Sequence, residues 1–200
     1  MQTSTSKQTA RFLILTGLMS VAFPALAHVD ASHAVSGFGS GFMHPLLGLD
    51  HLLAMLAVGI WAAQNQRPAL WLLPLVFPLM MVFGAALGIN GVHLAGIELG
   101  IAISLAVLGL LIAFTIKMPV GVSCALVALF AVVHGYAHGV ELPTADSAVL
   151  YGAGFILSTA LIHVFGISLS RWGNKNITSS ASRFSGAGIA AMGLTFIFFA

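Results

Sequence analysis

Charge is scarce in this sequence. Its 200 residues include seven Lys or Arg and five Asp or Glu, or 6% charged residues, against about a quarter in a typical soluble domain. The basic residues form no cluster that could follow a nucleic-acid backbone, which excludes a nucleic acid as partner. Cys124 is the only cysteine, so an internal disulfide and a thiolate-rich zinc or iron–sulfur site are excluded. The G-x-x-x-x-G-K-[ST] loop of ATP-driven proteins is missing too.

The sequence consists mostly of long apolar runs instead. Hydrophobic residues make up 59% of the chain, and the mean hydropathy is +1.05. A bilayer-crossing helix needs about 20 mostly apolar residues. Six such runs occur, at 44–64, 69–89, 93–116, 119–140, 147–170 and 183–200. We therefore expect an all-α integral membrane protein with six transmembrane helices, surrounded by the lipid bilayer.

The N-terminal segment resembles a secretory signal. Lys7 and Arg11 give it a positive start, residues 12–21 are apolar, and Ala-Leu-Ala at 25–27 has the small-x-small pattern of a cleavage site. We predict a cleavable signal peptide over 1–27 and a single six-helix transmembrane domain over 28–200. An uncleaved anchor helix is the alternative, and it leaves the topology unchanged.

The basic residues predict the orientation. If residue 28 lies outside, the connections between helices one and two, three and four, and five and six are cytoplasmic. All five basic residues after the signal fall in these connections: Arg67, Lys117, Arg171, Lys175 and Arg183. This is the positive-inside distribution. We expect a multi-pass protein of a bacterial inner membrane with both mature ends periplasmic.

Glycine pairs in the apolar runs indicate close helix packing. The small-xxx-small spacing allows two helix backbones to approach. It occurs at Gly84/Gly88, Gly96/Gly100 and Gly135/Gly139.

Eight histidines stand out among so few charges, and the first group opens the first predicted helix. Pro45 suits a first helical position, which puts His44 at the outer mouth. His44, His51 and Met55 share one helix face, and Asp50 and His51 lie roughly 10 Å deep at 1.5 Å per residue. On a straight helix, His44 and His51 are too far apart to share one ion. We therefore expect them to be successive ion-binding sites, or stations, along one path.

The second group closes the fourth predicted helix. His134 and His138 are four residues apart, a spacing that can chelate a metal, and Glu141 continues the same stripe. His134 and Glu98 of the third helix also lie about 10 Å deep. Three helices thus bring ionisable residues to one level. Such residues within a membrane indicate a functional site.

The remaining histidines carry weaker expectations. His28, His33 and His93 are expected to be solvated residues at the outer mouth, where they would at most gather ions loosely. His163 lies in the inner half of the fifth helix without an obvious partner. We interpret it as a hydrogen-bonded tie between helices, with an exit station for the ion as the alternative.

The donor set restricts the ion. Imidazole together with carboxylate suits borderline divalent metals such as Ni, Zn, Co, Fe and Mn. Copper(I) favours Cys and Met, of which only Met55 is well placed. Residue chemistry does not choose within the borderline group.

Two motifs resemble those of a known family. His44-x5-Asp50-His51, continued by Met55, and His134-Gly-x-x-His138-Gly-x-Glu141 are similar to the opening and second motifs of the HupE/UreJ family. The resemblance covers the whole chain and implies a nickel permease linked indirectly to urease or hydrogenase maturation. It implies Ni²⁺ as the transported substrate, with no permanently bound cofactor. It assigns the metal path to His44, Asp50, His51, His134, His138 and Glu141; Met55, Glu98, His93, His28 and His33 are additional candidates for the path.

Three alternatives use the same histidines. A membrane metallohydrolase would bind metal through His134 and His138, with Glu141 as base, but the H-E-x-x-H motif is absent. A haem carrier and a metal-free proton relay are the other two. We expect a permease and no enzyme. The sequence leaves open whether the protein is a homo-oligomer.

Overall fold

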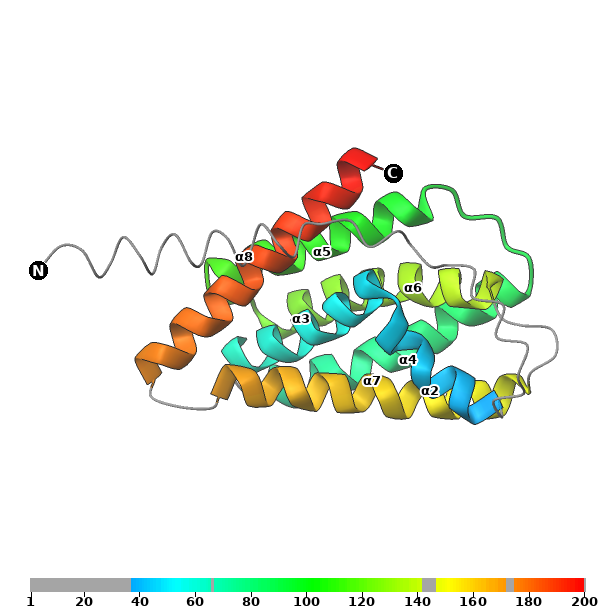
Figure 1. Ribbon diagram of the computed structural model, residues 1–200, viewed down its shortest axis with the longest axis horizontal. Helices are drawn as coiled ribbons and strands as arrows, with labels where there is room; N and C mark the ends of the chain where they lie inside the picture. The colour runs from blue at the N-terminus through cyan, green and yellow to red at the C-terminus, as the bar shows by residue number, and fades with distance from the viewer. Residues whose placement is uncertain (1–36, 66, 142–146, 172–174, 200) are drawn as a thin grey trace, which may run out of the picture. The chain divides into compact units, whose positions relative to one another are not determined.

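The computed structural model describes residues 37–65, 67–141, 147–171 and 175–199, and the side chains of 175–179 are not described. Within these ranges helix is the only regular secondary structure. Figure 1 shows the helices, which are α2 (Gly37–Leu47), α3 (Leu49–Asn65), α4 (Ala69–Ile89), α5 (Ile97–Ala113), α6 (Val120–Val140), α7 (Ala148–Arg171) and α8 (Lys175–Phe199).

Val35–Ala200 form one compact unit. The other unit, Met1–Ala34, lies outside the described residues. The predicted signal peptide therefore lies there, as do His28 and His33.

Four of the described helices are long and apolar enough to cross a membrane: α4, α6, α7 and the Ser180–Phe199 part of α8. Helices α2 and α3 pass the same test only as a pair, bent by 80° at their junction, so the number of spans is five if that pair is one span. Helix α5 has 17 residues, or about 25 Å, at the lower end of what a bilayer requires. The structure thus shows four or five spans by length and composition, where the sequence predicts six.

Three predicted spans differ from the observed helices. The sixth, predicted over 183–200, begins eight residues earlier, because α8 runs over Lys175–Phe199 and so includes Lys175 and Arg183, which the sequence places in a connection. The first helix begins at Gly37, so Pro45 lies inside α2 and not at a first helical position. The third is shorter than 93–116, because Gly91 and Gly96 adopt positive φ angles of 70° and 71° before it. Positive φ is readily adopted by glycine and is incompatible with a continuing α-helix. Hydropathy alone does not detect these features.

Helices α4 and α6 pack with their backbones in close approach. A Cβ atom on any of four glycines would collide with the backbone of the partner helix: Gly84, Gly88, Gly135 and Gly139. The small-xxx-small prediction is confirmed for these two pairs. It is wrong for Gly96/Gly100, because Gly96 caps α5 in a left-handed conformation and a Cβ there would meet no atom within 4 Å.

Helix α3 lies among the others and contacts α4, α5, α7 and α8. Nine of its seventeen residues are buried, as expected for a helix without a lipid-facing side. A Cβ atom at Gly59 would meet the His163 backbone, so α3 lies close against α7. The Trp61 Nε1–H donates to the Ile116 carbonyl oxygen at 2.9 Å. Helix α3 is therefore a fixed support for the residues at its N-terminal end.

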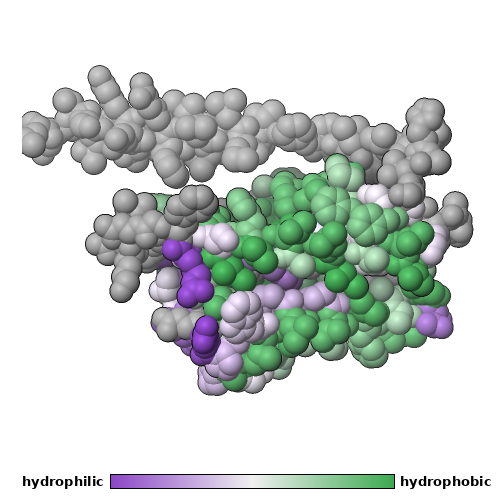
Figure 2. Space-filling view, turned by 90° about the horizontal axis from the view of Figure 1, so that it is seen from below, coloured by the Kyte–Doolittle hydropathy of each residue, from purple (hydrophilic) through white to green (hydrophobic). Residues whose placement is uncertain are grey.

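The outer surface of this unit is apolar. Figure 2 shows hydrophobic residues over most of the visible face, with the most hydrophilic residues near its ends. Large side chains such as Leu79, Phe83 and Phe165 are more than half exposed. An apolar surface this extensive is atypical of a soluble monomer and suits contact with lipid chains.

Candidate metal site

Four histidines from three helices form one cluster. The ring centroid of His51 lies 4.2 Å from that of His138 and 5.1 Å from that of His134. His44 of α2 completes the cluster, 4.7 Å from His138 and 6.4 Å from His51. Phe155 of α7 packs against the ring of His138 at 4.6 Å. We call these four residues the histidine cluster.

The break between α2 and α3 brings His44 to the cluster. Gly48 separates the two helices, which meet at 80°. Pro45 lacks the backbone N–H that would otherwise continue the helical hydrogen bonding. The prediction of one straight helix carrying His44 and His51 is therefore wrong. The bend places both rings around the same space.

Helix α6 contributes its two histidines as predicted. His134 and His138 are four residues apart on one face, and both are buried. The glycines beside them, Gly135 and Gly139, lie against α4 instead. The glycine face fixes α6 against α4 and directs the histidine face toward α3 and α7.

Asp50 orients His51. Its Oδ1 accepts a hydrogen bond from the His51 Nδ1–H at 2.7 Å and another from the His51 backbone N–H at 2.9 Å. The His51 Nε2 is buried and has no partner. A carboxylate on one imidazole nitrogen holds the ring and leaves the other nitrogen for a metal, as in many metal sites. The structure thus gives Asp50 an orienting contact that depth alone did not predict.

Ser104 of α5 has the same relation to His134. Its hydroxyl donates to the Ile101 carbonyl oxygen at 2.7 Å, and the His134 Nε2 lies 2.8 Å from the Ser104 Oγ. Because the only hydroxyl hydrogen is already used, Nε2–H of His134 is the donor to Ser104. The Nδ1 of His134 then carries the lone pair, and it is buried without a partner. Sequence reasoning missed Ser104; the available signal was a hydroxyl inside an apolar helix.

A chelating trio lies at the end of α6. Ligand atoms of His44, His138 and Glu141 all lie within 4.8 Å of one another. Glu141 is exposed, whereas His138 is 5% exposed. The trio therefore joins the histidine cluster to the surface.

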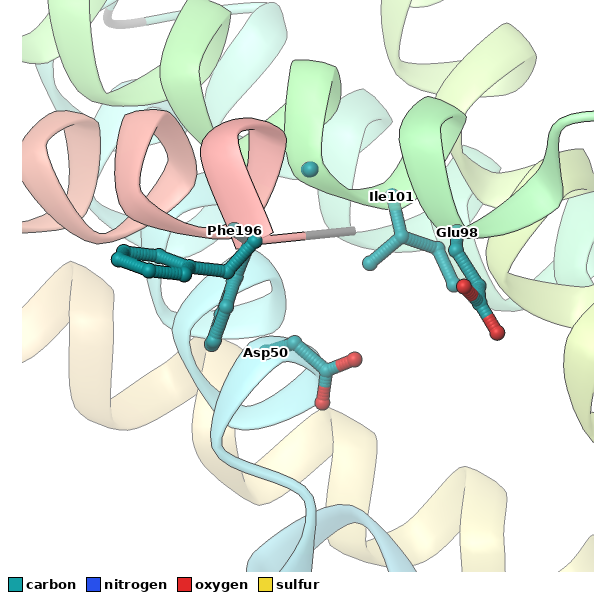
Figure 3. A pocket seen from close by; sticks show the side chains of 6 residues that line it. Asp50, Glu98, Ile101 and Phe196 are labelled. Atoms are coloured by element: carbon teal, nitrogen blue, oxygen red, sulfur yellow. The ribbon is translucent and has the colours of Figure 1, made fainter. Parts of the chain in front are cut away.

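Asp50 also faces a pocket on the side of α5 and α8. Figure 3 shows the carboxylates of Asp50 and Glu98 pointing into this pocket, which has a volume of about 210 Å³. Ile101, Ala102, Phe196 and Phe199 complete its lining. Glu98 is exposed in the first turn of α5. It shares the pocket with Asp50 and makes none of the ring contacts of the histidine cluster.

Met55 and His93 occupy different surroundings. Met55 is fully buried one turn below His51, and its sulfur accepts a hydrogen bond from the Thr159 hydroxyl at 3.4 Å. His93 is exposed in the connection between α4 and α5. The Tyr136 hydroxyl holds that connection through the Val92 carbonyl and the Leu94 N–H. His93 therefore stays near the C-terminal end of α6 without joining the cluster.

His163 is not a helix tie. It is 1% exposed, and neither of its ring nitrogens has a hydrogen-bond partner. Its ring instead packs edge-on against Phe77 of α4, with centroids 5.4 Å apart. The interpretation of this residue as a hydrogen-bonded link between helices is wrong.

The histidine cluster can bind a borderline divalent cation. In the described residues its buried nitrogens without partners are His51 Nε2, His134 Nδ1, and both His138 nitrogens. Buried polar atoms are normally hydrogen-bonded, so these nitrogens need a partner of another kind. One nitrogen of each neutral ring carries a hydrogen, so His51, His134 and His138 each offer one lone pair to a metal. Neutral imidazole nitrogens next to the carboxylates of Asp50 and Glu141 suit Ni, Co or Zn.

Apolar spans surrounding a histidine–carboxylate cluster define a multi-pass membrane protein with a candidate site for a divalent metal. Comparison with known proteins agrees with this class. The HupE / UreJ protein family model matches residues 16–196, and the chain belongs to the HupE/UreJ family. It is 40% identical to Protein HupE of Rhizobium leguminosarum bv. viciae over 180 residues, which cover 90% of this chain and 94% of that protein. No solved structure matches the chain.

Proposed function

We propose that this protein is a secondary permease that carries a divalent transition metal, with nickel as the first choice, across the bacterial inner membrane. The observation that carries the proposal is the histidine cluster, buried among apolar helices with ring nitrogens that have no partner. Ionisable residues inside a membrane domain are costly and mark ion pathways. Membership of the HupE/UreJ family supports nickel as the transported substrate.

The described side chains suggest an order of events. The trio of His44, His138 and Glu141 receives the hydrated ion, because Glu141 is exposed. The ion then exchanges waters for the nitrogens of His51 and His134 deeper inside. The Asp50 carboxylate offsets part of its charge. Each site binds weakly enough to release the ion to the next one.

The proposal includes the complete topology. The α2–α3 pair counts as one span and the short α5 as another, which makes six spans in the permease domain over 28–200. The signal peptide over 1–27 is removed, and both mature ends are periplasmic. The exposure of Arg67 and Lys117 in the connections before α4 and α6 supports this orientation, as does the exposed Arg183, whose Nε–H donates to the Ala113 carbonyl oxygen at the end of α5.

The protein is proposed to act as a carrier and not as an enzyme. Nickel is its substrate, delivered for a nickel enzyme such as a urease or a hydrogenase. The sequence has no G-x-x-x-x-G-K-[ST] loop that could bind a nucleotide. The ion therefore moves down its own gradient, or its transport is coupled to the gradient of another ion.

Metal uptake by cells tests the proposal. Cells that express the protein are compared with vector cells for accumulation of labelled nickel, with excess cobalt, zinc or manganese as competitors. We expect nickel accumulation above the vector level and the weakest competition from manganese, since its affinity for imidazole is the lowest of the four. Accumulation equal to vector cells for every metal would contradict transport. Preferential zinc uptake would identify zinc as the transported ion and would leave the permease proposal intact.

A further inference from the structure

His163 is a buried polar side chain that the histidine cluster does not use. It lies on α7, is 1% exposed, and has no hydrogen-bond partner at either ring nitrogen. A buried polar group without a partner destabilises the fold. An apolar residue of similar size would avoid that cost, so the imidazole at this position calls for a ligand.

Sulfur and hydroxyl donors lie beside His163. Thr159 precedes it by one helical turn and is on the same face of α7. The Thr159 hydroxyl contacts the Met55 sulfur at 3.4 Å, and both residues are fully buried. Gly59, one turn from Met55, lets α3 approach the His163 backbone closely. Imidazole, thioether and hydroxyl together suit a borderline cation.

One aromatic ring contacts both His163 and the histidine cluster. Phe77 of α4 is fully buried, and its ring centroid lies 6.1 Å from that of His134 and 5.4 Å from that of His163. His134 is the cluster member in this contact. Phe77 therefore connects the cluster to His163 through direct ring contacts.

His163 also lies farther inward than the cluster, because its backbone packs at Gly59, eight residues after His51 on α3. It is eight residues, or about 12 Å, from the Arg171 end of α7. Arg171 is at the side where the basic connections place the cytoplasm. The sequence of buried donors therefore runs from the outer trio through the histidine cluster to His163.

We propose that His163 forms a second metal-binding station against the Phe77 ring, with the Met55 thioether of α3 at the level of Thr159, one helical turn away along α7. The proposal rests on the proposed transport function. Carboxylates accompany the cluster through Asp50 and Glu141, whereas the donors identified beside His163 are neutral. A divalent ion is therefore held less tightly there, which suits its release toward the cytoplasm.

Cobalt(II) binding to a cysteine variant tests this station directly. A thiolate bound to Co²⁺ adds a sulfur-to-metal charge-transfer band that imidazole ligands do not produce. In the purified full-length protein, His163→Cys is expected to show this band on addition of Co²⁺. The wild type, which contains only Cys124, serves as the control for the native thiol. Val164→Cys is the matched control. Val164 is the next residue along α7 and is 59% exposed, so a cysteine there points away from the proposed station.

The outcomes distinguish the His163 station from the proposed transport function. A band in His163→Cys that is absent from Val164→Cys supports the station. Its absence, while visible cobalt absorption shows that the cluster is occupied, overturns the station and leaves the proposed function intact. No cobalt absorption in the wild type, together with no nickel uptake by cells, overturns the proposed function itself. Should His163→Cys fail to accumulate, Thr159→Cys probes the same space with the same two outcomes.

Uptake kinetics give an independent measurement. His163→Leu fills the space without offering a ligand. The maximum rate of nickel uptake is expected to fall about tenfold or more, while the apparent KM stays within about twofold, because the ion still binds first at the intact cluster. A residue with only a structural role would lower the protein level and leave uptake per molecule unchanged. That result would overturn the station.

Discussion

The ring of His51 lies 4.2 Å from the ring of His138, and no hydrogen bond joins them. The Nε2 of His51 and both nitrogens of His138 are buried without partners. Two imidazoles held in contact in this way have lone pairs available to a third group. A divalent cation between α3 and α6 would satisfy them, and the predictions below follow from this arrangement.

Asp50→Asn keeps the shape of the side chain and removes its negative charge. The His51 ring then loses a charge-assisted hydrogen bond, and the cation loses a nearby counter-charge. We expect the nickel concentration for half-maximal uptake to rise about 10- to 100-fold. The measurement is initial uptake rate against nickel concentration, normalised to protein in the membrane. Unchanged uptake would show that the Asp50–His51 pair has no part in transport.

Ser104→Ala removes the acceptor of the His134 Nε2–H. The ring then has no fixed tautomer, and we expect apparent nickel affinity to fall about tenfold. Ser123→Ala is a matched control, because Ser123 is equally buried and its hydroxyl has no partner. Nitrogen NMR of labelled histidine should show Nε2–H at His134 in the wild type and a mixture in Ser104→Ala. A wild-type ring with hydrogen on Nδ1 would contradict the assignment.

Gly48→Ala tests the break between α2 and α3. A Cβ atom there would lie 3.2 Å from both Asp50 Oδ1 and His51 Nδ1, so the pair must shift. We expect several-fold weaker nickel uptake with nearly normal membrane levels. Gly152→Ala on α7 is the control, because a Cβ there meets no atom within 4 Å. It should leave uptake unchanged and stabilise the helix by roughly 0.5–1 kcal/mol. Equal uptake by the two variants would indicate that the pair tolerates displacement.

Reporter fusions test the proposed topology. Fusions after Lys117 and Lys175 should report cytoplasm, whereas fusions after Thr144 and Ala200 should report periplasm, because the basic connections remain inside. Sequencing of the mature N-terminus should give His28 if the signal is removed. A cytoplasmic C-terminus would mean that α8 does not cross the membrane.

Sequence patterns predicted the regular parts of this fold well. The bounds of α4 and α6 agree with the predicted runs to within a residue, because long apolar runs bounded by turn residues have one low-energy solution in a bilayer. The four-residue spacing of His134 and His138 also sufficed to place them on one face. Their meeting with His51 followed from equal depth in different helices.

The irregular parts could not be predicted in this way. The bend at Gly48 depends on how α2 packs against α7, where a Cβ on Gly41 would collide with the Tyr151 backbone. Periodicity contains no information about such a contact. Ser104 was missed because its importance comes from one hydrogen bond across two helices. His163 was misinterpreted because a sequence does not show whether a buried nitrogen has a partner.

The central claim is that the histidine cluster carries the ion, and nickel accumulation by His51→Ala and His134→Ala tests it most directly. Cells expressing either variant are compared with wild-type and vector cells for nickel accumulated per molecule of membrane protein. Leu161→Ala, on the exposed face of α7, controls for an alanine substitution outside the cluster. We predict accumulation at the vector level for both histidine variants, with membrane levels near normal, because His51 Nε2 and His134 Nδ1 have no hydrogen-bond partner to lose. Normal transport by variants present at normal levels would contradict the account.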